Sequence, residues 1–161
     1  MSLLPGIERV PFNEAKSNFS GFVSDVVRKH ALRVLDRGRG QEQLLAIPVE
    51  DLLRGLAACR LDALVSAGER SLIARLPRFG LVASGDTFER AVDALHDELI
   101  DYCEDFFSDF DFYRHTSRIA HLPFLLRFAL TPPDDRRALL LEEPAEESAA
   151  AASEVSSAPT R

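Results

Sequence analysis

Cationic side chains recur through the first third of the chain, and their chemistry would suit phosphate binding. Lysine and arginine neutralise the phosphates of nucleic acids, and arginine also reads guanine bases in the major groove. Spacing alone, however, favours ordinary solvated surface charge. The cationic residues are Arg9, Lys16, Arg28, Lys29, Arg33, Arg37 and Arg39.

A second set of charged residues is acidic and repeats at helical spacing. Glu89, Asp93, Asp97, Asp101 and Asp105 follow one another at steps of four. Like charges at this spacing destabilise a helix by about 0.2–0.5 kcal/mol per pair. The pattern is typical of a solvated polar face, and the alternative is a face directed at a cationic partner. A divalent-metal site is the weakest interpretation, because the carboxylates follow the helix face and do not converge.

Nothing in the sequence predicts catalysis. There is no nucleophile-elbow motif, no phosphate loop and no Gly-x-Gly-x-x-Gly pattern. The histidines lack zinc or catalytic spacing, and two cysteines are too few for a disulfide framework or a zinc site. We therefore expect no catalytic residue, metal, cofactor or small-molecule substrate. These residues are His30, His96, His115, His121, Cys59 and Cys103.

The elements that must position the cationic residues form a small α+β unit. A short edge strand is expected at 7–11, and Asn13 is a good cap for one helix, or two, running to Lys29. Two strands, 31–37 and 41–47, would form a hairpin around a turn at Gly38–Gly40. A helix would begin after Pro48, so the order is β-α-β-β-α, ending near residue 58.

The acidic residues lie in a second predicted region, 59–130, which is read as a smaller ββα unit. Two short strands are expected at 72–76 and 81–83, and residues 60–68 read as helical or linking structure. A long amphipathic helix is expected at about 87–109, capped by Asp86 or Thr87. Its apolar stripe is Phe88, Val92, Leu95, Leu99, Tyr102, Phe106 and Phe110.

The end of the chain is simpler. Residues 122–130 are apolar and ambiguous between a strand and a buried helix, and a short helix is expected within 131–142. Residues 143–161 consist mainly of Ala, Ser, Glu and Pro, and we expect them to be disordered. The aromatic cluster Phe106, Phe107, Phe110 and Phe112 is either core or a docking surface, and core is favoured.

Charge and composition narrow the class of protein. The chain has 161 residues and a net charge of −7. Residues 1–56 contribute +1 (8 basic, 7 acidic) and the rest −8 (11 basic, 19 acidic), so the acidity does not exclude DNA binding by the first unit. No apolar run reaches the 18 residues or more that a membrane span would need. With two cysteines and no secretory pattern at residues 1–6, we expect a cytoplasmic protein with reduced thiols.

Residues 7–56 resemble the Phd/YefM (prevent-host-death) family of antitoxins. The resemblance rests on segments 10–20, 26–40 and 45–52, which match its strand–aromatic–cap–Glu-Ala opening, its hairpin and its acidic helix start. The family's first-helix arginine is Lys16 here, and its hairpin cation is retained as Arg37. Lysine lacks the bidentate fork of arginine, so Lys16 is expected to contact phosphate more readily than a base.

The rest of the chain is similar to longer Phd-like antitoxins that are paired with RelE-type toxins. Residues 80–91 are also similar to the strand–Gly-Asp-Thr–helix element of HicB-type antitoxins. The resemblance implies an antitoxin that neutralises a RelE-type mRNA interferase by direct binding. It also implies a homodimer, built on the first unit, that represses its operon at a palindromic operator. A stand-alone transcription regulator and a protein-interaction module that binds no DNA are the alternatives.

The charge and aromatic patterns, taken together with the resemblance, suggest candidate contact residues. For operator DNA they are Lys16, Arg37, Arg39, Asn18, Ser17 and Arg9. For the toxin they are Asp93, Asp97, Asp101, Asp105, Phe106 and Phe110.

Overall fold

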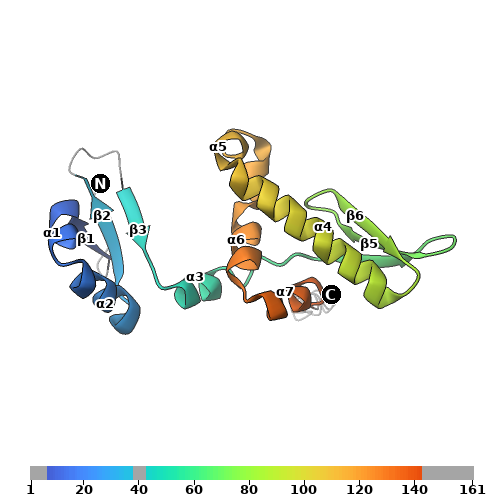
Figure 1. Cartoon of the computed structure of the whole chain (residues 1–161), viewed down its shortest axis with the longest axis horizontal. Helices are drawn as coiled ribbons and strands as arrows, with labels where there is room; N and C mark the ends of the chain where they lie inside the picture. Colours follow the sequence, from blue (N-terminus) through green and yellow to red (C-terminus); the bar gives the residue numbers. More distant parts are fainter. Residues whose placement is uncertain (1–6, 38–42, 143–161) are drawn as a thin grey trace, which may run out of the picture. The chain divides into compact units, whose positions relative to one another are not determined.

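The computed structural model describes residues 7–37 and 43–142 (Figure 1). The chain divides into two compact units, each described here by itself. The first contains residues up to Cys59 together with 122–131, and the second contains 60–121 and the residues from Pro132 onward. The predicted turn at Gly38–Gly40 and the predicted disordered tail lie outside the described residues.

The first unit is a three-stranded mixed sheet with helices. Strand β1 pairs in parallel with β2, and β2 pairs antiparallel with β3, so the order is β1-β2-β3 and β1 is an edge strand, as predicted. Parallel neighbours need a crossover connection, which α1 and α2 provide. The elements are β1 (Ile7–Pro11), α1 (Phe12–Ser17), α2 (Phe19–Lys29), β2 (Leu32–Asp36), β3 (Gln43–Ala46), α3 (Val49–Gly55) and α6 (Leu122–Leu130).

Two helices, rather than one, follow β1, and the chain breaks at Asn18. This residue has non-helical backbone angles (φ −131°, ψ 55°), and its side chain accepts a hydrogen bond from the Gly21 amide at 3.2 Å. Asn18 therefore caps α2. The predicted cap, Asn13, lies inside α1, whose cap position is occupied by Pro11. The predicted cap was wrong because α1 begins directly after Pro11, the last residue of β1, and so Asn13 is already helical.

The second unit is an antiparallel sheet with one long helix across a face. Strand order is β4-β5-β6, and α4 packs against all three strands (Figure 1). Helix α4 runs from Phe88 to Ser108, close to the predicted 87–109. The elements are β4 (Leu64–Ala67), β5 (Leu72–Leu76), β6 (Leu81–Gly85), α4 (Phe88–Ser108), α5 (Phe110–Tyr113), the 3-10 helix η1 (Ser117–His121) and α7 (Pro133–Leu140).

The predicted ββα order was wrong in one element, because β4 adds a third strand. Only four residues form it, and Leu64 is 58% exposed, so no strong alternation marks it in the sequence. Its hydrogen bonds to β5, in the register Leu64↔Arg75, define it as a strand. The second unit is also the larger of the two in described residues. The ambiguous segment 122–130 is the helix α6, which groups with the first unit and contacts α3.

The core of the second unit lies between α4 and its sheet. Leu95, Leu99 and Phe106 have no exposed surface, and Ala74 and Leu76 of β5 are equally buried. The 3.6-residue period therefore placed most of the buried side of α4 correctly, whereas Phe88 at the start of the predicted stripe is 42% exposed. In the first unit the core is small, and its buried apolar residues within the described segments are Val10, Ala15, Val26 and Val34 together with Leu125 and Phe128 of α6.

Candidate functional site

Of the two basic residues favoured for DNA contacts, Arg37 lies over an aromatic ring and Lys16 lies on the helix that carries this ring. Arg37 follows β2, and its guanidinium carbon lies 5.2 Å from the centre of the Phe12 ring. Phe12 begins α1 and Lys16 comes four residues later, so both project from one face of that helix. Lys16 is exposed and has no ion-pair partner among the residues described. The structure thus places one exposed cation over the Phe12 ring and a second on the helix that begins at Phe12.

A depression lies at this corner, where the parallel strands β1 and β2 end. Its volume is about 390 Å³, and it is lined by Pro11, Phe12, Asn13, Asp36 and Arg37. An amide, an aromatic ring and a guanidinium are groups that contact sugars and phosphates in protein–DNA interfaces. The corner therefore offers suitable chemistry for the backbone of a nucleic acid.

Arg9 is less available than the sequence suggested. Its guanidinium lies 3.3 Å from the Asp36 carboxylate, and the Asp36 side chain is only 14% exposed. This pair joins β1 to β2 and leaves Asp36 less able to repel a phosphate near Arg37. Arg39, the other predicted hairpin cation, lies outside the described residues.

Ser17 and Asn18 are engaged at the junction of α1 and α2. The Ser17 hydroxyl donates to the Glu14 carbonyl at 2.8 Å, and the Asn18 amide oxygen caps α2. A Cβ added at Gly21 would lie 2.7 Å from that oxygen, so the cap needs a glycine there. Both side chains are exposed, but their present contacts orient the helices that carry Lys16.

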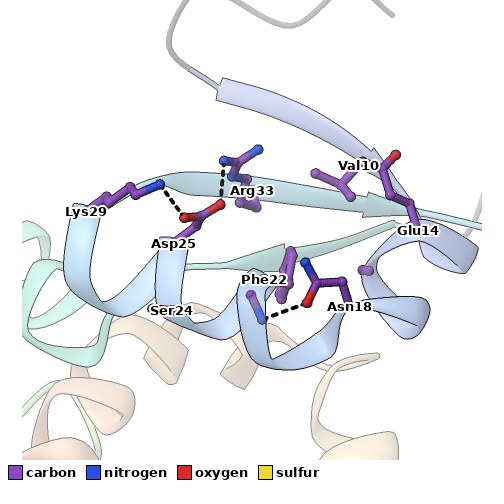
Figure 2. A pocket seen from close by; sticks show the side chains of 10 residues that line it. Val10, Glu14, Asn18, Phe22, Ser24, Asp25, Lys29 and Arg33 are labelled. Atoms are coloured by element: carbon purple, nitrogen blue, oxygen red, sulfur yellow. Dashed lines mark hydrogen bonds and ion pairs between the residues drawn. The ribbon is translucent and has the colours of Figure 1, made fainter.

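A second pocket of the first unit contains cations that are already paired. Its volume is about 400 Å³, and Figure 2 shows the side chains that line it, among them Asn18, Phe22 and Asp25. Asp25 lies 2.6 Å from the Lys29 ammonium and 3.5 Å from the Arg33 guanidinium, which also pairs with Glu8. The hydrogen bond from Lys29, with the charges of Lys29 and Arg33, lowers the pKa of Asp25. This network ties α2 to the sheet, and its cations are less suited to phosphate than Lys16.

His30 connects the end of α2 to the start of α3. It caps α2 in the left-handed region (φ 51°), and its Nδ1 lies 2.6 Å from Asp51 while its Nε2 lies 3.4 Å from Glu50. The Asp51 hydrogen bond and charge, aided by Glu50, raise the pKa of His30 despite some desolvation and the charge of Arg54. The spacing of histidines in the sequence gave no sign of this contact.

The predicted acidic face is present on α4, but its members differ in their surroundings. Asp93 pairs with Arg137 of α7 at 2.6 Å, and Asp97 lies 3.7 Å from the Nδ1 of His96. Asp101 and Asp105 are exposed and have no cationic partner within the described segments. Unpaired carboxylates of the predicted face therefore lie at both ends of the helix, because the exposed Glu89 also has no cationic partner among the described residues.

The two phenylalanines predicted to contact a toxin also differ. Phe106 has no exposed surface and belongs to the core, because the apolar stripe of α4 faces the sheet. Phe110 is partly exposed at the start of α5. Phe112, which was not among the predicted contact residues, is 60% exposed. The turn between α4 and α5 reorients the chain, so helical periodicity could not place these residues.

Aromatic residues near the C-terminal end of α4 are also held by polar contacts. The Tyr102 hydroxyl and His121 Nδ1 are 2.7 Å apart, and Arg118 lies over the rings of Tyr102 and Tyr113. Burial, together with the charges of Arg118 and Arg78, lowers the pKa of His121. The neutral imidazole of His121 can then accept a hydrogen bond from the Tyr102 hydroxyl, and this bond joins η1 to α4.

Exposed apolar side chains are concentrated on the first unit. Seven of the twelve large apolar residues that are exposed in the described chain belong to it. Phe19, Val23 and Val27 are spaced by four along α2 and form one solvent-facing stripe. Isolated surface apolar residues are ordinary, but a continuous stripe marks an interaction surface. The others are Phe12, Leu44, Leu45 and Val49.

The described residues contain no arrangement of three or more His, Cys, Asp or Glu side chains that could hold a metal ion. Burial raises the pKa of the Cys103 thiol to about 11, so it is a poor nucleophile at neutral pH. Within the same residues, no helix has the length and apolarity that crossing a bilayer requires.

Comparison with known proteins covers both units. A family model described as "PHD_like: Antitoxin of toxin-antitoxin, RelE / RelB, TA system" matches residues 7–142. A solved structure from Syntrophomonas wolfei subsp. wolfei, described as the antitoxin part of a candidate toxin/antitoxin system, has a TM-score of 0.74 and 24% sequence identity. The match covers 81% of this chain and 94% of that chain, and at this identity it shows a shared fold. No curated protein matches the sequence.

Proposed function

Because the chain belongs to the PHD-like family of antitoxins from toxin–antitoxin systems, we propose that it neutralises a RelE-type mRNA interferase and represses its own operon as a homodimer. The observation that carries the proposal is the extent of the family match, which includes both units. One unit would bind operator DNA and the other the toxin. Neutralisation would be steric and electrostatic, with no bond made or broken.

The first unit has the charge for a DNA interface. Lys16 and Arg37 would contact phosphates around Phe12, with Arg39 as a further cation. Ser17 and Asn18 would position α1 and α2 and could add hydrogen bonds to phosphate. Arg9 would act mainly by pairing with Asp36. One copy offers few contacts, so a two-fold dimer on a palindromic operator would double them.

Homodimerisation would use the exposed apolar side chains of the first unit. The stripe of Phe19, Val23 and Val27 on α2 is exposed in the isolated chain and would be covered by the same stripe of a second copy. Two-fold interfaces are self-complementary in this way. Burial of apolar surface stabilises such an interface by about 25 cal/mol per Å².

The second unit would bind the toxin. A ribonuclease must hold a polyanionic RNA, and its cationic surface would attract the carboxylates of α4. Asp97, Asp101 and Asp105 are the candidate contacts on that helix, and Phe110 is a candidate apolar contact. Asp93 is already paired with Arg137 and would contribute less.

Operator binding can be tested by measuring the affinity of the full chain for its own promoter at several salt concentrations. We expect Lys16→Ala/Arg37→Ala to weaken binding. Affinity for DNA falls as salt rises, and each phosphate contact adds about 0.9 to the steepness of log affinity against log salt. A dimer of the variant would lose four contacts, so this steepness should decrease by roughly 3 to 4.

The control is Lys29→Ala/Arg54→Ala, which removes the same charge from cations that are already paired with carboxylates. An equal loss in both double variants would refute the assignment to Lys16 and Arg37. If the wild-type chain binds its promoter no better than unrelated DNA, the repressor function is wrong.

Neutralisation can be tested by co-expressing the chain with a small basic protein encoded beside its gene. We expect the basic protein alone to stop the growth of the host cells. When both proteins are expressed, we expect the cells to grow and the two proteins to co-purify as a complex. If growth is not restored, the antitoxin function is wrong. If no such neighbour exists and the promoter is still bound, a stand-alone regulator becomes the better explanation.

A further inference from the structure

The carboxylates of the second unit are concentrated in α4 and α5, and Asp111 among them pairs with Arg114 at 2.8 Å. Residues 91–113 contain eight Asp or Glu residues and no Lys or Arg. Near the start of this segment α7 supplies a cation, because Arg137 lies 2.6 Å from Asp93. Near its end, four exposed carboxylates have no cationic partner within the described chain: Asp101, Glu104, Asp105 and Asp109.

Aromatic side chains adjoin these carboxylates at the turn from α4 to α5. Phe107, Phe110 and Tyr113 surround the buried Phe106, with ring centres 5.0 to 5.7 Å from it, and all three are partly exposed. Phe112 contacts Tyr113 edge-on at 5.4 Å and is 60% exposed. These contacts hold the exposed rings in place, so little side-chain entropy remains to be lost when a partner binds.

The same turn brings the charges and the rings together. Asp109 is the cap position of α5, and its carbonyl accepts hydrogen bonds from the amides of Phe112 and Tyr113 at 3.0 and 3.1 Å. The Asp109 amide in turn donates to the Asp105 carbonyl at 3.1 Å. These backbone hydrogen bonds therefore join the segment that carries the unpaired carboxylates to the segment that carries the exposed rings. We call residues 101–113 the acidic aromatic corner.

We propose, on the basis of the antitoxin function above, that the acidic aromatic corner is the main contact with the toxin and that Phe112 is its anchor. The partner would present an apolar pocket for Phe112, bordered by Lys or Arg side chains that pair with Asp101, Asp105 and Asp109. A second copy of this chain does not fit, because its identical corner would repel by charge. Nucleic acid does not fit for the same reason.

This arrangement assigns different effects to the two kinds of residue. Aromatic anchors at the centre of an interface dominate its affinity, whereas charges at the edge mainly set the association rate and its salt dependence. The corner also explains why Asp93 and Phe106 need not touch the toxin. One is paired with α7 and the other is buried.

The test measures binding kinetics between the full chain and the purified toxin encoded beside it. We expect Phe112→Ala to weaken binding at least tenfold, mainly through faster dissociation. We expect Asp101→Asn/Asp105→Asn to slow association and to reduce its salt dependence. Neither change should alter the melting temperature, because these side chains are exposed.

The controls match these variants in exposure and charge. Val82→Ala truncates an apolar residue on β6 that is 58% exposed, and Asp134→Asn/Asp135→Asn removes two exposed carboxylates from α7. Both should bind the toxin within twofold of the wild type. If Phe112→Ala lowers the melting temperature, the Asp101→Asn/Asp105→Asn variant decides whether the corner contacts the toxin, since this variant leaves the rings intact.

Two failures are distinguishable. If the wild type binds the toxin and the corner variants bind it equally well, the corner is not the contact, while the antitoxin function stands. If the wild type does not bind the toxin at all, the antitoxin function itself fails.

Discussion

Gly85 lies where β6 meets the first turn of α4, and the approach of the two backbones leaves no room for a side chain. A Cβ there would lie 2.7 Å from the Arg90 carbonyl carbon and 2.9 Å from the Ala91 Cα. The next two residues start the helix. Asp86 pairs with Arg90 at 2.9 Å, and the Thr87 hydroxyl accepts a hydrogen bond from the Arg90 amide at 3.2 Å. The Gly-Asp-Thr motif is thus a strand-to-helix junction.

We expect Gly85→Ala to destabilise the second unit by about 1–3 kcal/mol, because the added methyl group meets helix backbone that cannot shift without parting from the sheet. Denaturant unfolding measures this loss. Gly55→Ala is the matched control, since a Cβ at Gly55 has nothing within 4 Å, and an alanine in a helix is favourable by up to about 1 kcal/mol. Equal stability of the Gly85 variant and the wild type would show that the junction is not tightly packed.

At the scale of elements, most helices and strands follow from local pattern, and the exceptions have physical causes. The stripe of α4 predicted its length and buried face. Strand β4 was missed because its stability comes from pairing with β5, which lies eight residues later in sequence. The start of α2 depends on the cap made by Asn18. The contact between α2 and α3 depends on His30, whose partners Glu50 and Asp51 lie about 20 residues away in the sequence.

The His30 contact predicts pH-dependent stability. The carboxylates of Asp51 and Glu50 raise the folded-state pKa of His30 above its ordinary 6.5, whereas the unfolded chain keeps the ordinary value. A raised folded-state pKa stabilises the fold fully below about pH 6.5, and the stabilisation is lost as pH rises through the folded-state value. We expect the difference in unfolding free energy between wild type and His30→Gln to be larger at pH 6 than at pH 8.5.

Urea unfolding at the two pH values checks this prediction. Asp51, Glu50 and Arg54 are the charged groups that act on His30, and the His30→Gln variant leaves all three in place. His115→Gln provides a control, because His115 is exposed and its side chain has no partner among the described residues. A difference that grows with pH would contradict the proposed ion pairs.

At the scale of the whole molecule, two surface types are divided between the two units. Exposed apolar side chains are concentrated on the first unit, and unpaired carboxylates on the second. Such a division suits a protein that meets a copy of itself through one unit and a basic partner through the other.

If the apolar stripe of α2 forms a homodimer interface, the melting temperature should rise with protein concentration. We expect Val23→Glu/Val27→Glu to place like charges in that interface, to give a monomer and to abolish the concentration dependence. Analytical ultracentrifugation and thermal unfolding at several concentrations measure both effects. Leu64→Glu/Val82→Glu is the control, since these apolar residues are also exposed, at 58% each, and lie on the second unit. A dimer that tolerates the α2 variant must use another surface.

The sequence by itself determined the α+β class, the long amphipathic helix, the division of charge and the antitoxin family, because these depend on local periodicity, composition and motif order. Only the tertiary structure decided which of the candidate residues are available. Phe106 is buried, Asp93 and Arg9 are paired, and Phe112 is exposed. The physical reason is that exposure and pairing depend on groups far apart in the chain. Arg137 reaches Asp93 across 44 residues, a distance that no local pattern encodes.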